Sequence, residues 1–102
     1  MKTKSVSPAA PEHLTAASRQ WWDRVVGEYD LDASALRLLV LACEAWDRCA
    51  SAREVLDREG VVYIDRFDAP RTRPEVAIER DSRLAFLRLV RALGLSDDGG
   101  PA

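Results

Sequence analysis

A segment near the middle of this sequence is apolar in almost every helical direction. Residues 36–43 read Leu-Arg-Leu-Leu-Val-Leu-Ala-Cys, with one polar side chain. Because an α-helix turns about 100° per residue, such a helix has no solvated face and must be buried on several sides. A chain of 102 residues builds only a small core, with few elements to cover it. The segment therefore predicts a single helical domain that packs against a neighbouring subunit.

Capping signals place the two helices of the N-terminal half. The first is predicted over residues 16–28, with Thr15 as its N-cap and an apolar stripe at helical spacing, formed by Trp21, Trp22, Val25 and Val26. The second begins after Asp32 or Ser34, either of which can cap it, and continues to about Glu59. Gly60 follows at the position that commonly ends a helix.

The next segment is predicted to be β-structure followed by a third helix. Val61–Ile64 is β-branched and aromatic, and favours a short strand. Residues 65–73 could turn and return as a second strand, which would make a hairpin or a projecting arm. Pro74 suits the first position of a helix that runs to about Leu93. The fold class is thus mainly α, with short, long and medium helices and a small hairpin between the second and third.

The two ends of the chain show no periodicity. Residues 1–11 predict a flexible arm, residues 12–95 the helical domain, and residues 96–102 a polar, acidic and disordered tail. No apolar run approaches the roughly 20 residues of a membrane span, and the N-terminus does not have the pattern of a signal peptide. We therefore expect a cytoplasmic protein with no membrane partner.

The sequence shows no arrangement of residues that favours catalysis or metal binding. Cys43 and Cys49 are six residues apart, which points them about 120° away from each other on one helix, and His13 is distant in sequence. We interpret both thiols as small, reduced core residues. Glycine-rich phosphate loops, Ser-His-Asp sets and defensible carboxylate pairs are not found. The prediction is a protein that is not an enzyme and needs no cofactor or metal.

Charge is distributed unevenly along the chain. The net charge of −2 argues against a simple nucleic-acid binder. From Glu12 to Glu59 there are ten acidic residues and six arginines, whereas from Arg66 to Arg91 there are seven arginines and four acidic residues. Such polarity can serve DNA binding or head-to-tail contacts between subunits.

Several short motifs, in this order, resemble the small terminase subunits of tailed phages, in the group usually called the P27 family. The motifs are Ala10-Pro11-Glu12-His13-Leu14 with Trp22, then Cys43-Glu44-Ala45-Trp46 followed by Glu59-Gly60, and finally Pro74-Glu75-Val76 with Arg80 and Leu93-Gly94-Leu95. Each motif alone is weak, and the order and spacing make the combination more specific. The resemblance covers roughly residues 8–96.

The resemblance implies a helical subunit that forms a ring, a homo-oligomer, in the cytoplasm of the bacterial host. It also implies recognition of double-stranded viral DNA and control of the large terminase subunit, which holds the ATPase and nuclease activities. The small subunit would be non-catalytic. Many relatives carry a basic tail after Gly-Leu, whereas this chain continues with Asp97-Asp98-Gly99, so the basic role could have moved to the connector before Pro74.

Two sets of residues are the candidates for these roles. Phosphate contacts are made by Lys and Arg, and the predicted DNA-binding residues are Lys2, Lys4, Arg66, Arg71, Arg73, Arg80 and Arg83. Any one of these arginines could instead pair with acids on a neighbouring subunit or stay solvated. The predicted oligomer interface consists of Trp21, Leu38, Leu41, Phe86 and Leu89.

Two other classes of function stay open. A small dimeric DNA-binding regulator could use the first two helices as a helix-turn-helix. However, Leu36, Leu38 and Leu39 stand where a recognition helix would carry polar base-reading residues. A protein-only adaptor, whose charges serve subunit contacts, would fit the loss of the basic tail.

Overall fold

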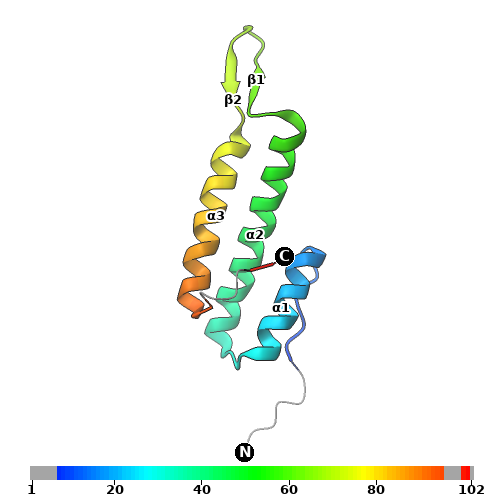
Figure 1. Ribbon diagram of the computed structural model, residues 1–102, viewed down its shortest axis with the longest axis vertical. Helices are drawn as coiled ribbons and strands as arrows, with labels where there is room; N and C mark the ends of the chain where they lie inside the picture. The colour runs from blue at the N-terminus through cyan, green and yellow to red at the C-terminus, as the bar shows by residue number, and fades with distance from the viewer. Residues whose placement is uncertain (1–6, 96–99, 102) are drawn as a thin grey trace, which may run out of the picture.

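The computed structural model of the protein describes residues 7–95 and 100–101. Figure 1 shows α2 and α3 running antiparallel, α1 beside the part of α2 nearest its N-terminus, and a β-hairpin that projects beyond the other end of the helix pair. The elements, in chain order, are α1 (Ala16–Glu28), α2 (Ala33–Glu59), β1 (Val62–Ile64), β2 (Pro70–Thr72) and α3 (Pro74–Leu93). The predicted three helices with a hairpin between the second and third are confirmed.

The helix boundaries follow the capping residues. Thr15 caps α1 by accepting a hydrogen bond from the Ser18 amide, and Asp32, rather than Ser34, caps α2 by accepting one from the Ala35 amide. At the other end of α2, Gly60 has a φ of 88°, and Gly94 ends α3 with a φ of 78°. Both values lie in the region that glycine adopts without a steric penalty, so each helix stops where its glycine stands.

The core lies at the end of the molecule where all three helices meet. Phe86 of α3 contacts Trp21 of α1 and Trp46 of α2, with ring centroids 5.5 and 5.1 Å apart. Leu39 is fully buried beside them. Aromatic pairs at this distance add to the burial of their apolar surface. Because these side chains come from three helices, they hold α1 against the α2–α3 pair within one chain.

The described parts of both termini also contact the helices. The Trp22 Nε1 group donates a hydrogen bond to the Pro8 carbonyl, 2.9 Å away, and the Gly100 carbonyl accepts one from Arg24 Nη2 at 3.2 Å. Gly100 and Pro101 are buried, and a Cβ atom on Gly100 would lie only 2.6 Å from Phe86 Cζ. Nothing in the polar composition of the tail indicated this contact.

The hairpin pairs β1 with β2 in antiparallel register, with Tyr63 opposite Arg71. Its loop is set by Asp65, whose carboxylate accepts hydrogen bonds from the amides of Phe67 and Ala69 and whose carbonyl accepts one from the Asp68 amide. Asp68 has a φ of 65°, a conformation that aspartate tolerates better than most residues. A turn followed by a left-handed residue is a common three-residue hairpin loop, so the turn fixes the register.

Candidate functional site

The outward face of α3 gathers arginine side chains around two exposed leucines. Arg80 and Arg91 are eleven residues apart, which places them within about 20° on the helix and about 16 Å along it. Leu84 and Leu87 lie between them and are 44% and 52% exposed. We call this surface the arginine face of α3; its members are Arg80, Arg83, Leu84, Leu87, Arg88 and Arg91, all of which are exposed.

The four arginines differ in how strongly acids hold them. Arg80 Nε lies 3.2 Å from the Asp81 carboxylate, and Arg83 Nη1 lies 3.5 Å from Glu79, which also binds Arg53 at 2.6 Å. Within the described ranges, Arg88 and Arg91 have no acid within ion-pair distance. Exposed ion pairs contribute little free energy, so all four guanidinium groups can be turned to a ligand. Arg88 and Arg91 are the freest of them.

Arg88 and Arg91 are absent from the predicted DNA-binding set, although the sequence held a signal for them. The helical period that starts at Arg80 returns to the same face at Leu84, Leu87 and Arg91. Arg80 and Arg83, which were predicted, lie on or beside this face. The prediction followed the local density of arginines in the sequence. A prediction based on the exposed side of the helix would have included Arg80, Arg83, Arg88 and Arg91.

The arginines of the connector are used within the hairpin. Arg71 Nε donates to the Asp65 carboxylate at 2.9 Å, and this hydrogen bond, aided by the Ala69 and Phe67 amides, lowers the pKa of Asp65. Arg73 lies over the Tyr63 ring, 5.6 Å from its centroid, with its Nη2 atom 3.8 Å from a Glu59 oxygen. Both side chains therefore stabilise the hairpin and its junction with α2. Their predicted role at phosphate stays a prediction.

The other predicted DNA-binding residues lie at the ends of the molecule. Arg66 is exposed in the hairpin loop, with its guanidinium 4.9 Å from the centre of the Phe67 ring. Lys2 and Lys4 lie outside the described residues. The structure thus brings Arg80 and Arg83 together with Arg88 and Arg91, and separates all four from the loop arginine.

The predicted oligomer interface divides into buried and accessible residues. Trp21 and Phe86 are only 1% and 5% exposed, because they pack against each other inside the chain. They are enclosed within the described chain, and their predicted role at a subunit contact stays a prediction. Leu41 is 50% exposed, while Leu38 and Leu89 are half-buried. These three leucines retain accessible surface for a neighbouring subunit.

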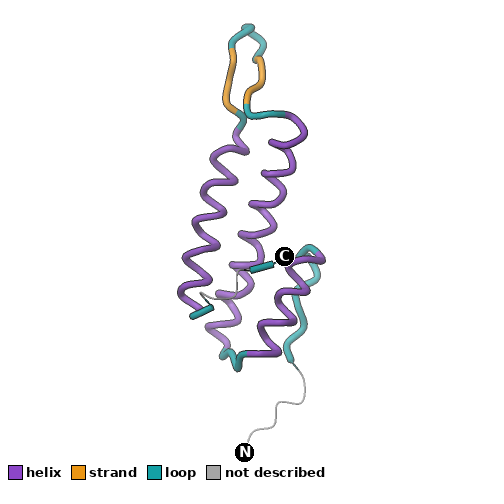
Figure 2. Tube along the Cα trace, in the orientation of Figure 1, coloured by secondary structure: helices purple, strands orange, loops and turns teal. Residues whose placement is uncertain are grey.

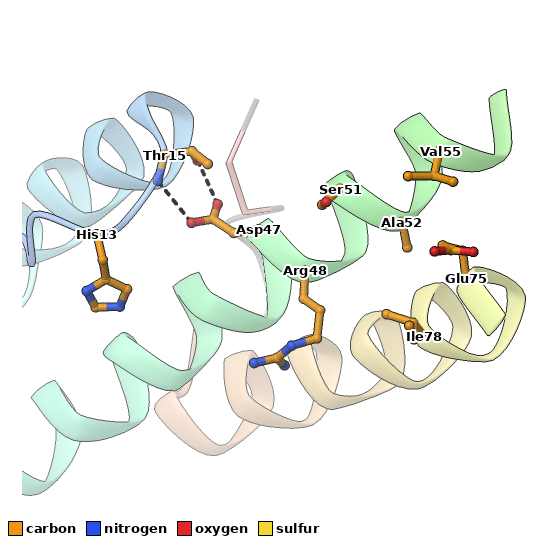
Figure 3. Close-up of a pocket in the computed structure, with 9 residues that line it drawn as sticks. All are labelled: His13, Thr15, Asp47, Arg48, Ser51, Ala52, Val55, Glu75 and Ile78. Carbon is orange, nitrogen blue, oxygen red and sulfur yellow. Dashed lines mark hydrogen bonds between the residues drawn. The ribbon is translucent and has the colours of Figure 1, made fainter. Parts of the chain in front are cut away.

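An open groove of about 520 Å³ runs beside the N-terminus of α1, between α2 and α3 (Figure 3). Asp47 occupies one end, where its carboxylate accepts hydrogen bonds from the Thr15 amide at 2.9 Å and from the hydroxyls of Thr15 and Ser18 at 2.6 Å. Its polar atoms are therefore committed to holding α1 on α2. The lining residues are His13, Thr15, Asp47, Arg48, Ser51, Ala52, Val55, Glu75 and Ile78.

The thiols do not form a reactive site. Cys43 is buried, and burial, followed by the nearby Asp47 and Glu44 carboxylates, raises its pKa to about 12, so the thiol stays protonated. Cys49 is half-buried between α2 and α3, with Sγ 3.6 Å from the Glu79 carbonyl. Both are unpaired, as predicted, but Cys49 is less buried than we expected. Over residues 7–95 and 100–101, no three His, Cys, Asp or Glu side chains are grouped to hold a metal ion.

The family comparison assigns most of the chain. The family model described as phage terminase, small subunit, matches residues 18–98, more than three quarters of the length. Neither a curated protein nor a solved structure matches the chain. No helix in the described part of the chain is long and apolar enough to cross a membrane. The chain belongs to the family of phage terminase small subunits, and its assignment to the P27 group stays a prediction.

Proposed function

We propose that this terminase small subunit is a non-catalytic component of phage DNA packaging that binds double-stranded viral DNA through the arginine face of α3. It acts in the cytoplasm of the bacterial host as a homo-oligomer, and it regulates the large subunit that carries the ATPase and nuclease activities. The observation that supports DNA binding is the row of four exposed arginines along α3, with Arg80 and Arg91 in line and Arg83 and Arg88 to either side of them.

The geometry of this face suits a phosphate backbone. Four guanidinium groups are spread over about 16 Å of helix, while double-stranded DNA carries one charge per about 1.7 Å of its axis. Arg80 and Arg83 must give up an ion pair to bind phosphate, whereas Arg88 and Arg91 form none with a described acid. We therefore assign Arg88 and Arg91 first. Repetition of the face around an oligomer would multiply contacts that are individually weak.

The accessible leucines of α2 and α3 support the oligomer. Leu41 is half exposed in the apolar segment 36–43 of α2, and Leu38 and Leu89 keep part of their surface free. An apolar side chain in this position gains free energy when a neighbour covers it, at about 25 cal/mol per Å². The acidic first half and arginine-rich second half of the chain would favour head-to-tail packing over a symmetric pair.

A second candidate is a protein-only adaptor. Leu84 and Leu87 are exposed in the middle of the arginine face, and exposed leucines next to arginines are also found at protein interfaces. In this case the face would bind the large subunit rather than DNA. The two candidates predict different responses to salt, which a single set of variants can separate.

The test is binding of labelled double-stranded DNA by fluorescence anisotropy across salt concentrations. For Arg88→Gln/Arg91→Gln we expect at least about 10-fold weaker binding at low salt, and a slope of log K against log salt that is smaller by about 2. The charge-matched control, Arg19→Gln/Arg58→Gln, removes two exposed arginines from α1 and α2 and should keep the slope.

Two outcomes would contradict DNA binding by this face. One is a wild-type protein that does not bind DNA even at low salt. The other is an unchanged slope in the Arg88→Gln/Arg91→Gln variant. If Leu84→Ala/Leu87→Ala then loses binding to purified large subunit, the adaptor role is supported in its place.

A further inference from the structure

Two arginines share one acid, Glu79, at the seam between α2 and α3. Figure 2 shows the two helices side by side below the hairpin. Arg53 Nη2, from α2, donates a hydrogen bond to Glu79 Oε2 at 2.6 Å. Arg83 Nη1, from α3, lies 3.5 Å from the same oxygen. We call Arg53, Glu79 and Arg83 the seam triad; it joins guanidinium groups from two helices on a single carboxylate oxygen.

The seam triad adjoins the arginine face of α3. Arg83 follows Glu79 by four residues and Arg80 by three, which places it about 40° from the first and about 60° from the second, between the two round the helix. Arg83 therefore belongs both to the arginine face and to the triad. A phosphate backbone that lies on the arginine face can continue across the seam to Arg53, which is exposed on the neighbouring helix.

The acid is the least exposed member of the triad. The Glu79 side chain is 13% exposed, whereas those of Arg53 and Arg83 are more than half exposed. Hydrogen bonds between two ionised groups are shorter and stronger than neutral ones, and 2.6 Å is a short one. Arg53 also lies 3.7 Å from Asp57, but both of these side chains are well exposed, so water screens that pair. Glu79 is therefore the acid that holds Arg53.

We propose that Arg53 is a further phosphate contact of the DNA-binding surface, and that Glu79 is a positioning residue that withholds it. The inference rests on the DNA binding of the proposed function and extends its surface to α2. In the free protein the Glu79 carboxylate occupies the place of a phosphate oxygen, between two guanidinium groups. A phosphate that approaches Arg83 must therefore compete with an acid that is fixed in the protein.

This competition keeps DNA binding reversible. When a phosphate takes the two arginines, Glu79 loses its partners while it is largely buried, and an unpaired buried charge is costly. The cost opposes the gain from the new phosphate contact. In an oligomer every subunit repeats the triad, so a small restraint in each copy has a large effect on the affinity of the whole assembly.

Glu79→Gln tests the restraint by removing the charge and keeping the shape. The amide oxygen can still accept from Arg53, but as a neutral group it competes less well with phosphate. We expect DNA binding at low salt to become at least about 5-fold tighter, and the slope of log K against log salt to become steeper by about 1. Fluorescence anisotropy with labelled double-stranded DNA measures both quantities.

Two further variants show where any gain comes from. Glu54→Gln removes the same charge from an exposed position next to Arg53, about 100° away round α2 and outside every ion pair of the described residues. It should keep the wild-type slope, which excludes a general effect of net charge. Arg53→Gln/Glu79→Gln should return the slope to about the wild-type value, because the released contact is then absent.

A purely structural role for Glu79 predicts a different result. The pair with Arg53 also joins α3 to α2, so its loss can lower the free energy of unfolding, measured in urea. Lower stability with an unchanged salt slope in Glu79→Gln would overturn the proposal. So would equal slopes in Glu79→Gln and in the double variant, since the gain would then come from a residue other than Arg53.

The outcomes separate this inference from the proposed function. A wild-type protein that does not bind DNA even at low salt contradicts both. If the slope falls in Arg88→Gln/Arg91→Gln but does not rise in Glu79→Gln, DNA binding by the arginine face stands and only the withheld contact is overturned. If the slope rises in Glu79→Gln while Arg88→Gln/Arg91→Gln matches the wild type, the seam contact is supported and the assignment of Arg88 and Arg91 is wrong.

Discussion

The end of the molecule that holds α1 and the end that holds the hairpin use similar side chains with opposite results. At the first end, Leu39 and the aromatic rings around Phe86 are enclosed by three helices. At the second, Ile64 and Phe67 are exposed to solvent. The difference lies in the number of elements that meet, because among the described residues the two strands project beyond the helices and pair only with each other (Figure 1). Apolar residues therefore indicate that a segment tends to be buried, but they do not show whether the same chain or a second molecule covers it.

The largest expected effect comes from a cavity at the enclosed end. Leu39→Ala should lower the free energy of unfolding by about 2–5 kcal/mol, since the side chain is fully buried. Phe67→Ala, at the exposed end, should change it by less than about 0.5 kcal/mol. Urea unfolding at a protein concentration that keeps both variants in one association state makes the comparison. A large loss for the loop variant would mean that the hairpin is covered within the chain.

A polar contact also holds the enclosed end together. Asp47→Ala removes the acceptor for Thr15 and Ser18 at the start of α1, and we expect a loss of about 1–3 kcal/mol. The control, Asp57→Ala, removes an exposed carboxylate of the same helix that lies 3.7 Å from Arg53, and should cost little. Tryptophan fluorescence reports on α1 directly, because Trp21 and Trp22 belong to it. Equal losses in the two variants would show that the contact with α1 contributes nothing specific.

The tail provides a smaller test of how closely the enclosed end is packed. Gly100→Ala places a methyl group 2.6 Å from Phe86 at a φ of 84°, so the tail should detach at a cost of about 1 kcal/mol. Gly27→Ala, which meets open space within α1, should raise stability by about 0.5–1 kcal/mol. Thermal melts of the two variants should therefore shift in opposite directions. A Gly100→Ala protein as stable as the wild type would contradict the packed position of the tail.

The smallest expected effect is at the exposed end, where a turn rather than a core sets the structure. Asp68→Gly removes the strain of a left-handed residue and should stabilise the hairpin by less than about 1 kcal/mol. The readout is slower exchange of the Arg73 amide, which donates across the strands to Val61. Faster exchange would show that the aspartate side chain contributes more to the loop than its backbone conformation costs.

Local patterns predicted the elements of this fold well. Thr15, Gly60 and Pro74 begin or end helices where the sequence placed them, because capping depends on neighbouring residues. Contacts between distant residues were not predictable in the same way. The hydrogen bonds from Thr15 to Asp47 and the packing of Gly100 on Phe86 depend on how the helices pack against each other. The periodicity of a sequence shows which face of a helix is buried, but not which residues of another helix it meets.

The candidate site was predicted in part, for a related reason. Counting arginines indicated the connector, but Arg71 and Arg73 face carboxylates that folding brings beside them. Arg88 and Arg91 stand apart from any described acid, and the helical period of α3, unlike a count of arginines, relates them to Arg80 and Arg83. Likewise, the sequence did not reveal that Trp21 and Phe86 pack against each other within the chain.

The turn at Asp65 has a kinetic consequence. Its three short-range hydrogen bonds join residues at most four apart, so the loop can close long before subunits collide. Hairpins form in about 1–10 μs, whereas two proteins at micromolar concentration meet productively over about 0.1–10 s. Each newly made subunit would thus arrive with its strand register already chosen. In the oligomer that we propose, the hairpin would then need no slow folding step after two subunits meet.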